Sequence, residues 1–308
     1  MIAPHTSHAS RVYKLDGPLE VYQSRAALVM RNDYELFTLL LQRRRSGANK
    51  MRFSNAIVRL PGANFSDGLT TSTSNAAPDV NKALKQHAAY CGALKDCGLN
   101  LTVMDANLQY PDGTFVEDTF VIADRVAIAT RPGAKTRMGE IASVAGALRP
   151  FRSHWEQIEA PGTVDGGDIC QADEHFFIGL SARTNAAGAA QLAAILERHH
   201  YSASTVDIRS HATLLHLKSG IAYLGERRFL VAHGFPAIDA IAAAERIEVA
   251  QSEAYAANCV RVNDQVLIAA GFPGVATALK KIGFRVRALE MSEFAKMDGG
   301  LSCLSLRF

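Results

Sequence analysis

A repeated strand pair is the feature of this 308-residue chain that most constrains its fold. Two short apolar segments, separated by a polar turn, recur along the chain with a period of roughly 45 to 50 residues. The predicted pairs are 118–124 with 125–130, 168–172 with 175–180, 213–218 with 220–224, and 258–262 with 265–269. Segments with helical periodicity lie between the pairs, so the pattern predicts a repeated α/β unit.

Helices are predicted between these strand pairs. The clearest runs from Pro78 to Gly98, where apolar residues recur every three or four positions between a proline that suits a first turn and a glycine that suits a stop. His87 and Cys91 lie on its apolar stripe, so we interpret them as packing residues. The other predicted helices span about 139–148, 185–199, 236–247 and 273–283.

Two predicted strands, 54–60 and 301–306, have no partner close to them in the sequence. Pairing these two strands would close the chain into a ring of five modules. Ring closure also removes exposed sheet edges, which are prone to pair with other chains. The alternative is an ordinary open α/β sheet, but the pattern favours the ring.

Residues 1–50 do not follow the repeat. They contain eight Lys and Arg and four Asp and Glu, without a clear alternation of strand and helix. The composition changes at Met51, so we interpret 1–50 as an N-terminal extension, poorly ordered or absent from the native product, and 51–308 as one domain. A targeting segment is the alternative, but the four acidic residues disfavour it.

The composition excludes several functional classes. Beyond residue 50, 25 Lys and Arg stand against 26 Asp and Glu, which lacks the basic excess typical of nucleic-acid binding. Five cysteines without a CxxC pair fit neither a disulfide framework nor a zinc ribbon, and they favour a reducing, cytoplasmic setting. There is no apolar run of about eighteen residues and no secretory signal pattern, so we expect no membrane association.

Polar residues stand where the repeated strands are predicted to begin. They are Glu117 and Asp118 in TFVEDTFVI, Asp165 and Asp168 in TVDGGDIC, His216 in LLHLKS, and Cys303 in GGLSCLSL. If equivalent positions converge on the ring axis, a thiol, an imidazole and carboxylates would share one pocket. As adjacent strand residues, Glu117 and Asp118 are expected to point in opposite directions.

Each of these residues also has a structural interpretation. Cys303 could be a buried core cysteine, His216 a satisfied core or surface side chain, and the aspartates acceptors in turns. For Asp168 the turn role suffices. A thiol near its reference pKa is mostly protonated at neutral pH, so a nucleophilic Cys303 would need His216 or a cationic substrate to favour ionisation.

The ordered segments FVEDTFVI, ATRPGAKTR, VDGGD, GLSARTN, LHLKS, AANC and MDGGLSC resemble the guanidine-modifying superfamily, and most closely its dimethylarginine dimethylaminohydrolase family. The resemblance spans 51–308 and implies a pentein fold, a five-bladed α/β-propeller built from ββαβ-type repeats. It implies that Cys303 is the nucleophile, that His216 transfers protons, and that Asp165 pairs with the guanidinium and orients the imidazolium.

The resemblance also implies a set of substrate-binding residues. Asp118 would bind the guanidinium, and the arginines would bind the α-carboxylate with forked donors. The loop before the first long helix would form a lid against bulk water. The full set is Leu69 in that loop, Asp112, Glu117, Asp118, Arg131, Arg183, Met297 through its backbone, and Asp298.

The implied reaction is hydrolysis of Nω-methylated arginine to citrulline and a methylamine through a covalent thiouronium on Cys303. It needs no cofactor, and a zinc ion bound by Cys303 and the neighbouring histidine would be an adventitious inhibitor. The protein would act on this small molecule as a monomer or homodimer. The alternatives are an amidinotransferase, a noncatalytic amino-acid binding protein, and an arginine deiminase, which usually has an acidic residue where this chain has Lys218.

Overall fold

The computed structural model describes residues 52–71, 76–211, 213–236, 241 and 244–308, so the predicted extension 1–50 lies outside the described residues. The described residues form five three-stranded sheets with one common plan. In each sheet two strands pair antiparallel, and a third strand runs parallel to the second.

The strands of each sheet follow one another in the sequence, except in the sheet that joins the two ends of this region. The sheets consist of β15 (Leu306–Arg307), β1 (Asn55–Arg59) and β2 (Asn100–Met104); β3 (Phe120–Ile122), β4 (Ala127–Ala129) and β5 (Glu156–Gln157); β6 (Ile169–Ala172), β7 (His175–Leu180) and β8 (Ser202–Asp207); β9 (Ile221–Gly225), β10 (Arg228–Ala232) and β11 (Glu245–Val249); and β12 (Val260–Val262), β13 (Gln265–Ala269) and β14 (Arg285–Leu289).

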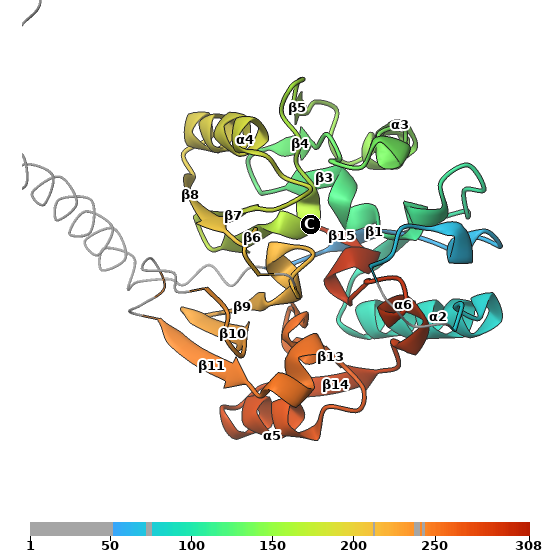
Figure 1. The fold of residues 1–308 in the computed structure, drawn as a ribbon, viewed down its shortest axis with the longest axis vertical. Helices are drawn as coiled ribbons and strands as arrows, with labels where there is room; N and C mark the ends of the chain where they lie inside the picture. The colour runs from blue at the N-terminus through green and yellow to red at the C-terminus, as the bar shows by residue number, and fades with distance from the viewer. Residues whose placement is uncertain (1–51, 72–75, 212, 237–240, 242–243) are drawn as a thin grey trace, which may run out of the picture. The chain divides into compact units, whose positions relative to one another are not determined.

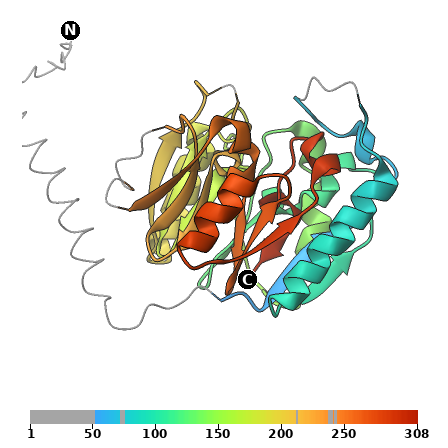
Figure 2. The same cartoon turned by 90° about the horizontal axis from the view of Figure 1, so that it is seen from below.

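The predicted ring closure is confirmed. Strand β15 pairs antiparallel with β1, which places Arg307 opposite Ala56 and Leu306 opposite Ile57. Figure 1 shows the sheets arranged around a common centre, with the longer helices at the periphery. In the perpendicular view of Figure 2, helices α2 (teal) and α5 (orange-red) lie on the outside of the ring. This is the pentein propeller of ββαβ-type repeats.

The long helices connect the second and third strands of their sheets. They are α2 (Val80–Asp96), α3 (Glu140–Leu148), α4 (Ala186–Arg198) and α5 (Pro273–Lys281), and the short α6 (Ser292–Ala295) precedes the last turn. Side-chain oxygens of Asp79 and Asn185 accept backbone N–H groups at the start of α2 and α4, which are typical N-caps.

Most of the predicted helices are confirmed, with one exception. The prediction of a helix over 236–247 is wrong at its end, because Glu245–Val249 forms strand β11, and much of its remainder lies outside the described residues. His87 is buried in α2, where burial lowers its pKa to about 4, as expected of a packing residue. Among the described residues no helix combines the length and the apolar character that a membrane crossing requires.

Short 3-10 turns replace the predicted beginnings of the strands. They are η3 (Val116–Thr119), η5 (Gly166–Asp168), η6 (Leu217–Ser219), η8 (Gln251–Ala257) and η9 (Ser302–Leu304), each just before the first strand of a sheet. The prediction that Glu117, Asp118, His216 and Cys303 lie on strands is therefore wrong. These turns arise because buried side chains such as Asp168 accept backbone N–H groups that would otherwise enter a strand ladder.

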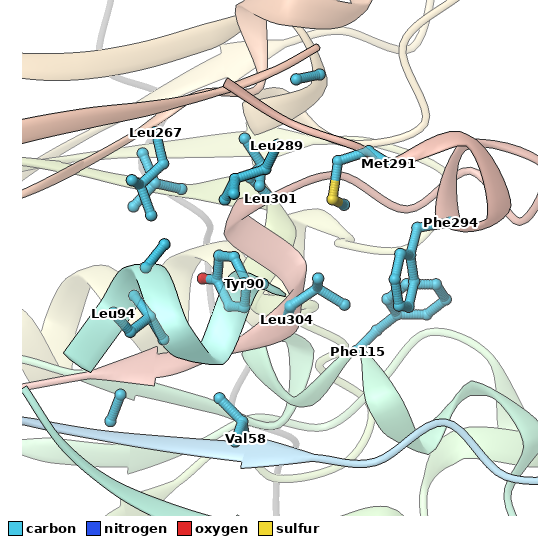
Figure 3. Close-up of a cluster of buried hydrophobic side chains, with 14 of the residues drawn as sticks. Val58, Tyr90, Leu94, Phe115, Leu267, Leu289, Met291, Phe294, Leu301 and Leu304 are labelled. Atoms are coloured by element: carbon cyan, nitrogen blue, oxygen red, sulfur yellow. The ribbon is translucent and has the colours of Figure 1, made fainter. Parts of the chain in front are cut away.

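A hydrophobic cluster anchors the last of these turns. Leu301 and Leu304, on either side of Cys303, are buried with Tyr90 and Leu94 of α2 and with Phe294 of α6 (Figure 3). Burying one such leucine contributes roughly 1.5 to 3 kcal/mol. The cluster therefore fixes the backbone of η9 from both sides while Cys303 itself stays partly exposed.

Candidate active site

The predicted convergence of polar residues is present for three of them. Asp118, Asp165 and His216 come from turns before three successive sheets, and one ligand atom of each lies within 4.8 Å of the others. All three side chains are buried. Oδ2 of Asp165 lies 3.1 Å from Nε2 of His216, so this carboxylate orients the imidazole.

Asp118 is held by a cation and by a backbone amide. Its Oδ1 accepts the N–H of Gly167 at 2.8 Å, and its Oδ2 lies 2.5 Å from Nη1 of Arg137. Burial disfavours the ionised carboxyl, but the charges of His216 and Arg137 lower the pKa of Asp118 to about 2. Asp118 is therefore ionised at neutral pH.

Glycines allow the close approach of these side chains. Oδ1 of Asp165 accepts the N–H of Gly133 at 2.8 Å, and a Cβ on Gly133 would lie 2.3 Å from the carbonyl oxygen of Arg183. A Cβ on Gly167 would lie 2.7 Å from Nδ1 of His216. Both positions therefore require glycine for packing.

His216 is a protonated imidazolium at neutral pH. Burial alone would lower its pKa, but the carboxylates of Asp118, Asp168 and Asp165 raise the pKa of His216 to about 9. An imidazolium held in this way can donate a proton to a leaving amine. The resulting neutral imidazole can then accept a proton from water.

Cys303 is a neutral thiol at neutral pH. Burial and the negative charges of Glu117 and Asp118 raise the pKa of Cys303 to about 12. The charge of Asp118 thus affects the ionisation of both Cys303 and His216. A cation bound beside Asp118 would offset these negative charges and favour the thiolate.

Glu117 faces the interior of the ring. Its Oε2 accepts the hydroxyl of Ser302 at 2.8 Å, and its Oε1 pairs with Nζ of Lys218 at 2.7 Å and with Nη2 of Arg307 at 3.1 Å. The same groups line a cavity of about 150 Å³ within the ring. Both oxygens of Glu117 are thus bonded to side chains of this chain.

Four of the expected substrate residues lie together at one rim of the site. The backbone N–H of Leu69 donates to Oδ1 of the buried Asp112 at 3.0 Å, and the N–H and hydroxyl of Thr71 donate to Oδ2 of Asp298. Gly68 lies against Asp112 and against the buried Met297. The Leu69 side chain is 39% exposed, so it is available to contact a ligand.

Arg131 and Arg183, the two arginines expected to bind the α-carboxylate, lie in different environments. Nη1 of Arg131 donates to the carbonyl oxygen of Gly162, and its backbone forms a bridge with Val164. Arg183 lies near enough to Asp112 to lower the pKa of that carboxyl, although burial raises it overall. Sequence reasoning missed the buried Arg137, which is the last residue of the ATRPGAKTR segment.

Arg137 lies in η4 (Lys135–Arg137) and forms a buried ion-pair network. It pairs with Asp118 at 2.5 Å and with Glu140 at 2.8 Å, and it donates to the carbonyl oxygen of Phe115. The sequence feature that could have revealed this ion pair is the i,i+3 spacing of Arg137 and Glu140 at the start of a predicted helix.

Asp168 has the structural role that was expected of it. Its Oδ2 accepts the hydroxyls of Ser181 and Thr184, and its Oδ1 accepts the N–H of Leu217. This carboxylate therefore joins β7, the start of α4 and the His216 turn.

The polar cluster suits an organic cation better than a metal ion. Arg137 and protonated His216 already place two positive charges next to the carboxylates of Asp118 and Asp165. The permanent charge of Arg137 next to Asp118 disfavours a compact divalent cation. A guanidinium spreads its charge and offers N–H donors to carboxylates. The predicted inhibitory zinc at Cys303 stays a prediction.

Comparisons with known proteins agree with this geometry. The arginine deiminase family model matches residues 149–265. The N(G),N(G)-dimethylarginine dimethylaminohydrolase of Pseudomonas aeruginosa is 44% identical over 257 residues, which cover 83% of this chain and 100% of that protein. The enzyme of the same name from Streptomyces coelicolor is 32% identical and is covered over 98% of its length.

Solved structures of dimethylarginine dimethylaminohydrolase are also similar to this chain. A mutant of the P. aeruginosa protein complexed with citrulline superposes with a TM-score of 0.81 at 43% identity, covering 84% of this chain and 100% of that chain. The N-terminal domain of ArgZ, bound covalently to a reaction intermediate, has a TM-score of 0.74 at 18% identity, a likeness of fold alone.

Proposed function

Because the chain belongs to the dimethylarginine dimethylaminohydrolase family, we propose that it hydrolyses Nω-methylated arginine to citrulline and dimethylamine or methylamine. The protein is a hydrolase of C–N bonds in linear amidines. The observation that carries the proposal is the convergence of Asp118, Asp165 and His216 in one buried cluster, in which Asp118 also helps to raise the pKa of the partly exposed Cys303.

Binding of the guanidinium is the first step. The carboxylates of Asp118 and Asp165 pair with its N–H groups and hold its plane next to the Cys303 sulfur. The bound positive charge offsets the negative charges that raise the pKa of Cys303. The thiol therefore loses its proton to solvent water when the substrate is in place, because His216 already carries a proton.

Two chemical steps follow. The Cys303 thiolate attacks the guanidinium carbon, and the C–N bond to the methylated amine breaks as His216 gives its proton to the leaving nitrogen. The neutral His216 then takes a proton from water, which attacks the thiouronium carbon. The C–S bond breaks as the proton of the new hydroxyl passes to the sulfur, so citrulline is released and the Cys303 thiol is restored.

The amino-acid end of the substrate binds at the rim. Arg183 and Arg131 donate to the α-carboxylate. Asp112, Asp298 and the backbone of Met297 complete the pocket around the α-amino group and the side chain. Glu117, whose oxygens bond to Ser302, Lys218 and Arg307, contributes to the pocket indirectly, through the turn that carries Cys303. Leu69 closes over the substrate as a lid, supported by its hydrogen bond to Asp112.

These steps use side chains of this chain alone, so we assign no metal or organic cofactor. We propose that residues 51–308 form the single catalytic domain and that the enzyme acts in the cytoplasm as a monomer or homodimer. Its partner is the small methylated amino acid, without a role for nucleic acid or membrane.

A parallel assay of four substrates tests the proposed function. Citrulline release is measured from dimethylarginine and monomethylarginine, and ureide formation from arginine and agmatine under the same conditions. We expect turnover of the methylated arginines in water without an added amine. A preference for unmethylated arginine would indicate a deiminase, a requirement for an amine acceptor would indicate an amidinotransferase, and binding without turnover would indicate a noncatalytic protein.

A further inference from the structure

Asn258 connects the two turns that carry the thiol and the imidazole. Its Oδ1 accepts the backbone N–H of Ser302 at 3.0 Å, and its Nδ2 donates to the hydroxyl of Ser302 at 3.2 Å. The same Nδ2 donates to the carbonyl oxygen of Lys218 at 3.1 Å. Ser302 precedes Cys303 in η9, and Lys218 lies two residues after His216 in η6.

The chemistry of its partners fixes the orientation of this amide. The backbone N–H of Ser302 can only donate and the carbonyl of Lys218 can only accept, so Oδ1 and Nδ2 cannot exchange places. Asn258 is buried, at 8% exposure. A buried amide with three of its four hydrogen-bonding positions in use resists rotation, since losing any of these bonds leaves a buried polar group unpaired.

Gly300 provides the space that Asn258 occupies. A Cβ on Gly300 would lie 2.4 Å from Cγ and 2.5 Å from Oδ1 of Asn258. Gly300 has no left-handed φ angle that would require glycine for the backbone. The side chain of Asn258 is therefore what excludes a larger residue at this position.

Glu117 forms a second link between the same two turns. One of its oxygens accepts the Ser302 hydroxyl at 2.8 Å, and the other pairs with Lys218 at 2.7 Å. The hydroxyl of Ser302 thus donates a hydrogen bond to Glu117 and accepts one from Asn258. These two bonds use the one donor and one of the two acceptor positions of the hydroxyl. Ser302 and Lys218 are joined both through a neutral amide and through a carboxylate.

We propose that Asn258 is a positioning residue that holds the Cys303 turn at its working distance from the His216 turn. This inference rests on the proposed function, in which the sulfur and the imidazole act on the same carbon. Asn258 acts through Ser302 and Lys218, and it does not contact the substrate. A displacement of about 1 Å between reacting groups can lower a rate about a hundredfold.

Replacing Asn258 tests the proposal through a separation of kcat from KM. We expect Asn258→Ala to lower kcat about tenfold to a hundredfold and to change KM less than about threefold, because the guanidinium carboxylates are untouched. Asn263→Gly is the matched control, since Asn263 also makes three side-chain hydrogen bonds, to Phe53 and Cys97, outside the site. Glycine suits its φ angle of 52°. The control should retain the wild-type kcat.

A double mutant separates positioning from a general loss of stability. Gly300→Ala should also lower kcat, because the new methyl group displaces the amide of Asn258. In the Asn258→Ala background the space is open, so Gly300→Ala should change kcat less than about twofold further. Additive losses, or a folded Asn258→Ala enzyme with the kcat of the wild type, would overturn the proposal.

Alkylation of Cys303 gives a readout that does not need turnover. Loosening η9 exposes the thiol, so Asn258→Ala should react with iodoacetamide at least about threefold faster at neutral pH, measured by mass spectrometry of the Cys303 peptide. The wild type and Asn263→Gly should react alike. If the wild type has no hydrolase activity, the proposed function fails, but the alkylation rates still decide the role of Asn258, and equal rates in all three proteins would refute it.

Discussion

The carboxylate of Asp165 lies 3.1 Å from the imidazole of His216, although 51 residues separate them in the sequence. Asp165 precedes the turn of one sheet, and His216 precedes the turn of the next. The repeated module therefore converts two equivalent sequence positions into one acid–base pair. This arrangement, together with Asp118 beside it, determines the protonation state in which the enzyme meets its substrate.

The pKa of His216 predicts a specific dependence of stability on pH. Its pKa is raised in the folded state to about 9 from a reference of 6.5, because the nearby carboxylates outweigh burial. The charged imidazolium thus contributes stability that is fully present below about pH 6.5 and is lost as the pH rises through about 9. The contribution is about 3 kcal/mol.

Urea unfolding between about pH 6 and about pH 10 measures this contribution. We expect the wild type to lose stability over this interval relative to His216→Gln, and kcat to fall above about pH 9. The exposed His233 serves as a control, and His233→Gln should follow the wild-type curve. Parallel curves for the wild type and His216→Gln would contradict the assignment.

Asp118 raises the pKa of the Cys303 thiol, so removing its charge should make the free thiol more reactive. If the pKa of the thiol falls by about one unit, the fraction of thiolate at neutral pH rises about tenfold. A thiolate of lower pKa is also a weaker nucleophile, so the net gain in alkylation rate is about threefold. We therefore expect Asp118→Asn to be alkylated faster at neutral pH while its turnover collapses. The exposed Asp105→Asn variant should change neither rate. Slower alkylation of Asp118→Asn would count against the account.

Arg137 should be essential for folding stability. It is 6% exposed and pairs with Asp118 and Glu140, which are 4% and 1% exposed, so its loss leaves buried carboxylates without a partner. We expect Arg137→Met to lower the free energy of unfolding by about 3 to 5 kcal/mol, measured by urea denaturation. Arg209, whose pair with Asp207 is exposed to solvent, is the control, and Arg209→Met should cause little change. If Arg137→Met and Arg209→Met lowered the free energy of unfolding equally, the stabilising role of the buried network would be contradicted.

Asp298 should control the lid. It accepts two hydrogen bonds from Thr71, two residues after Leu69, and its backbone has a φ angle of 56°. We expect Asp298→Gly to raise KM about tenfold, since it removes these bonds and keeps the backbone. Asp298→Asn keeps an acceptor oxygen for Thr71 and should raise KM less than Asp298→Gly does. If both variants bind substrate as the wild type does, the loop is not held through Asp298.

The sequence predicted the ring because the main evidence for it, the repeated pairs of strands, lies within short stretches of the chain. Apolar segments around strands such as β6 and β7 are short, close together and separated by a turn. The closing pair β1 and β15 followed from the absence of local partners. The third strands were missed because they carry a weak signal: β8 has the sequence SASTVD with one fully buried residue, and β5 has only two residues.

The site was predicted in its residue types but not in its local geometry. The turns at Asp118 and His216 depend on hydrogen bonds between modules, such as that from Gly167 to Asp118, and no local pattern encodes them. Arg137 and Asn258 were missed because the partners that tie them to the site are distant in the sequence: Asp118 lies 19 residues from Arg137, and Ser302 lies 44 residues from Asn258. Their importance is visible only when burial and hydrogen bonds are considered together.

The most direct test of the account is to trap the covalent intermediate on Cys303. The enzyme is quenched with acid during turnover, and the peptide that contains Cys303 is analysed by mass spectrometry. We predict a substrate-derived adduct of the same mass from dimethylarginine and monomethylarginine, because the methylated amine has already left. Turnover of both substrates without an adduct, or retained turnover in Cys303→Ser, would contradict a cysteine nucleophile.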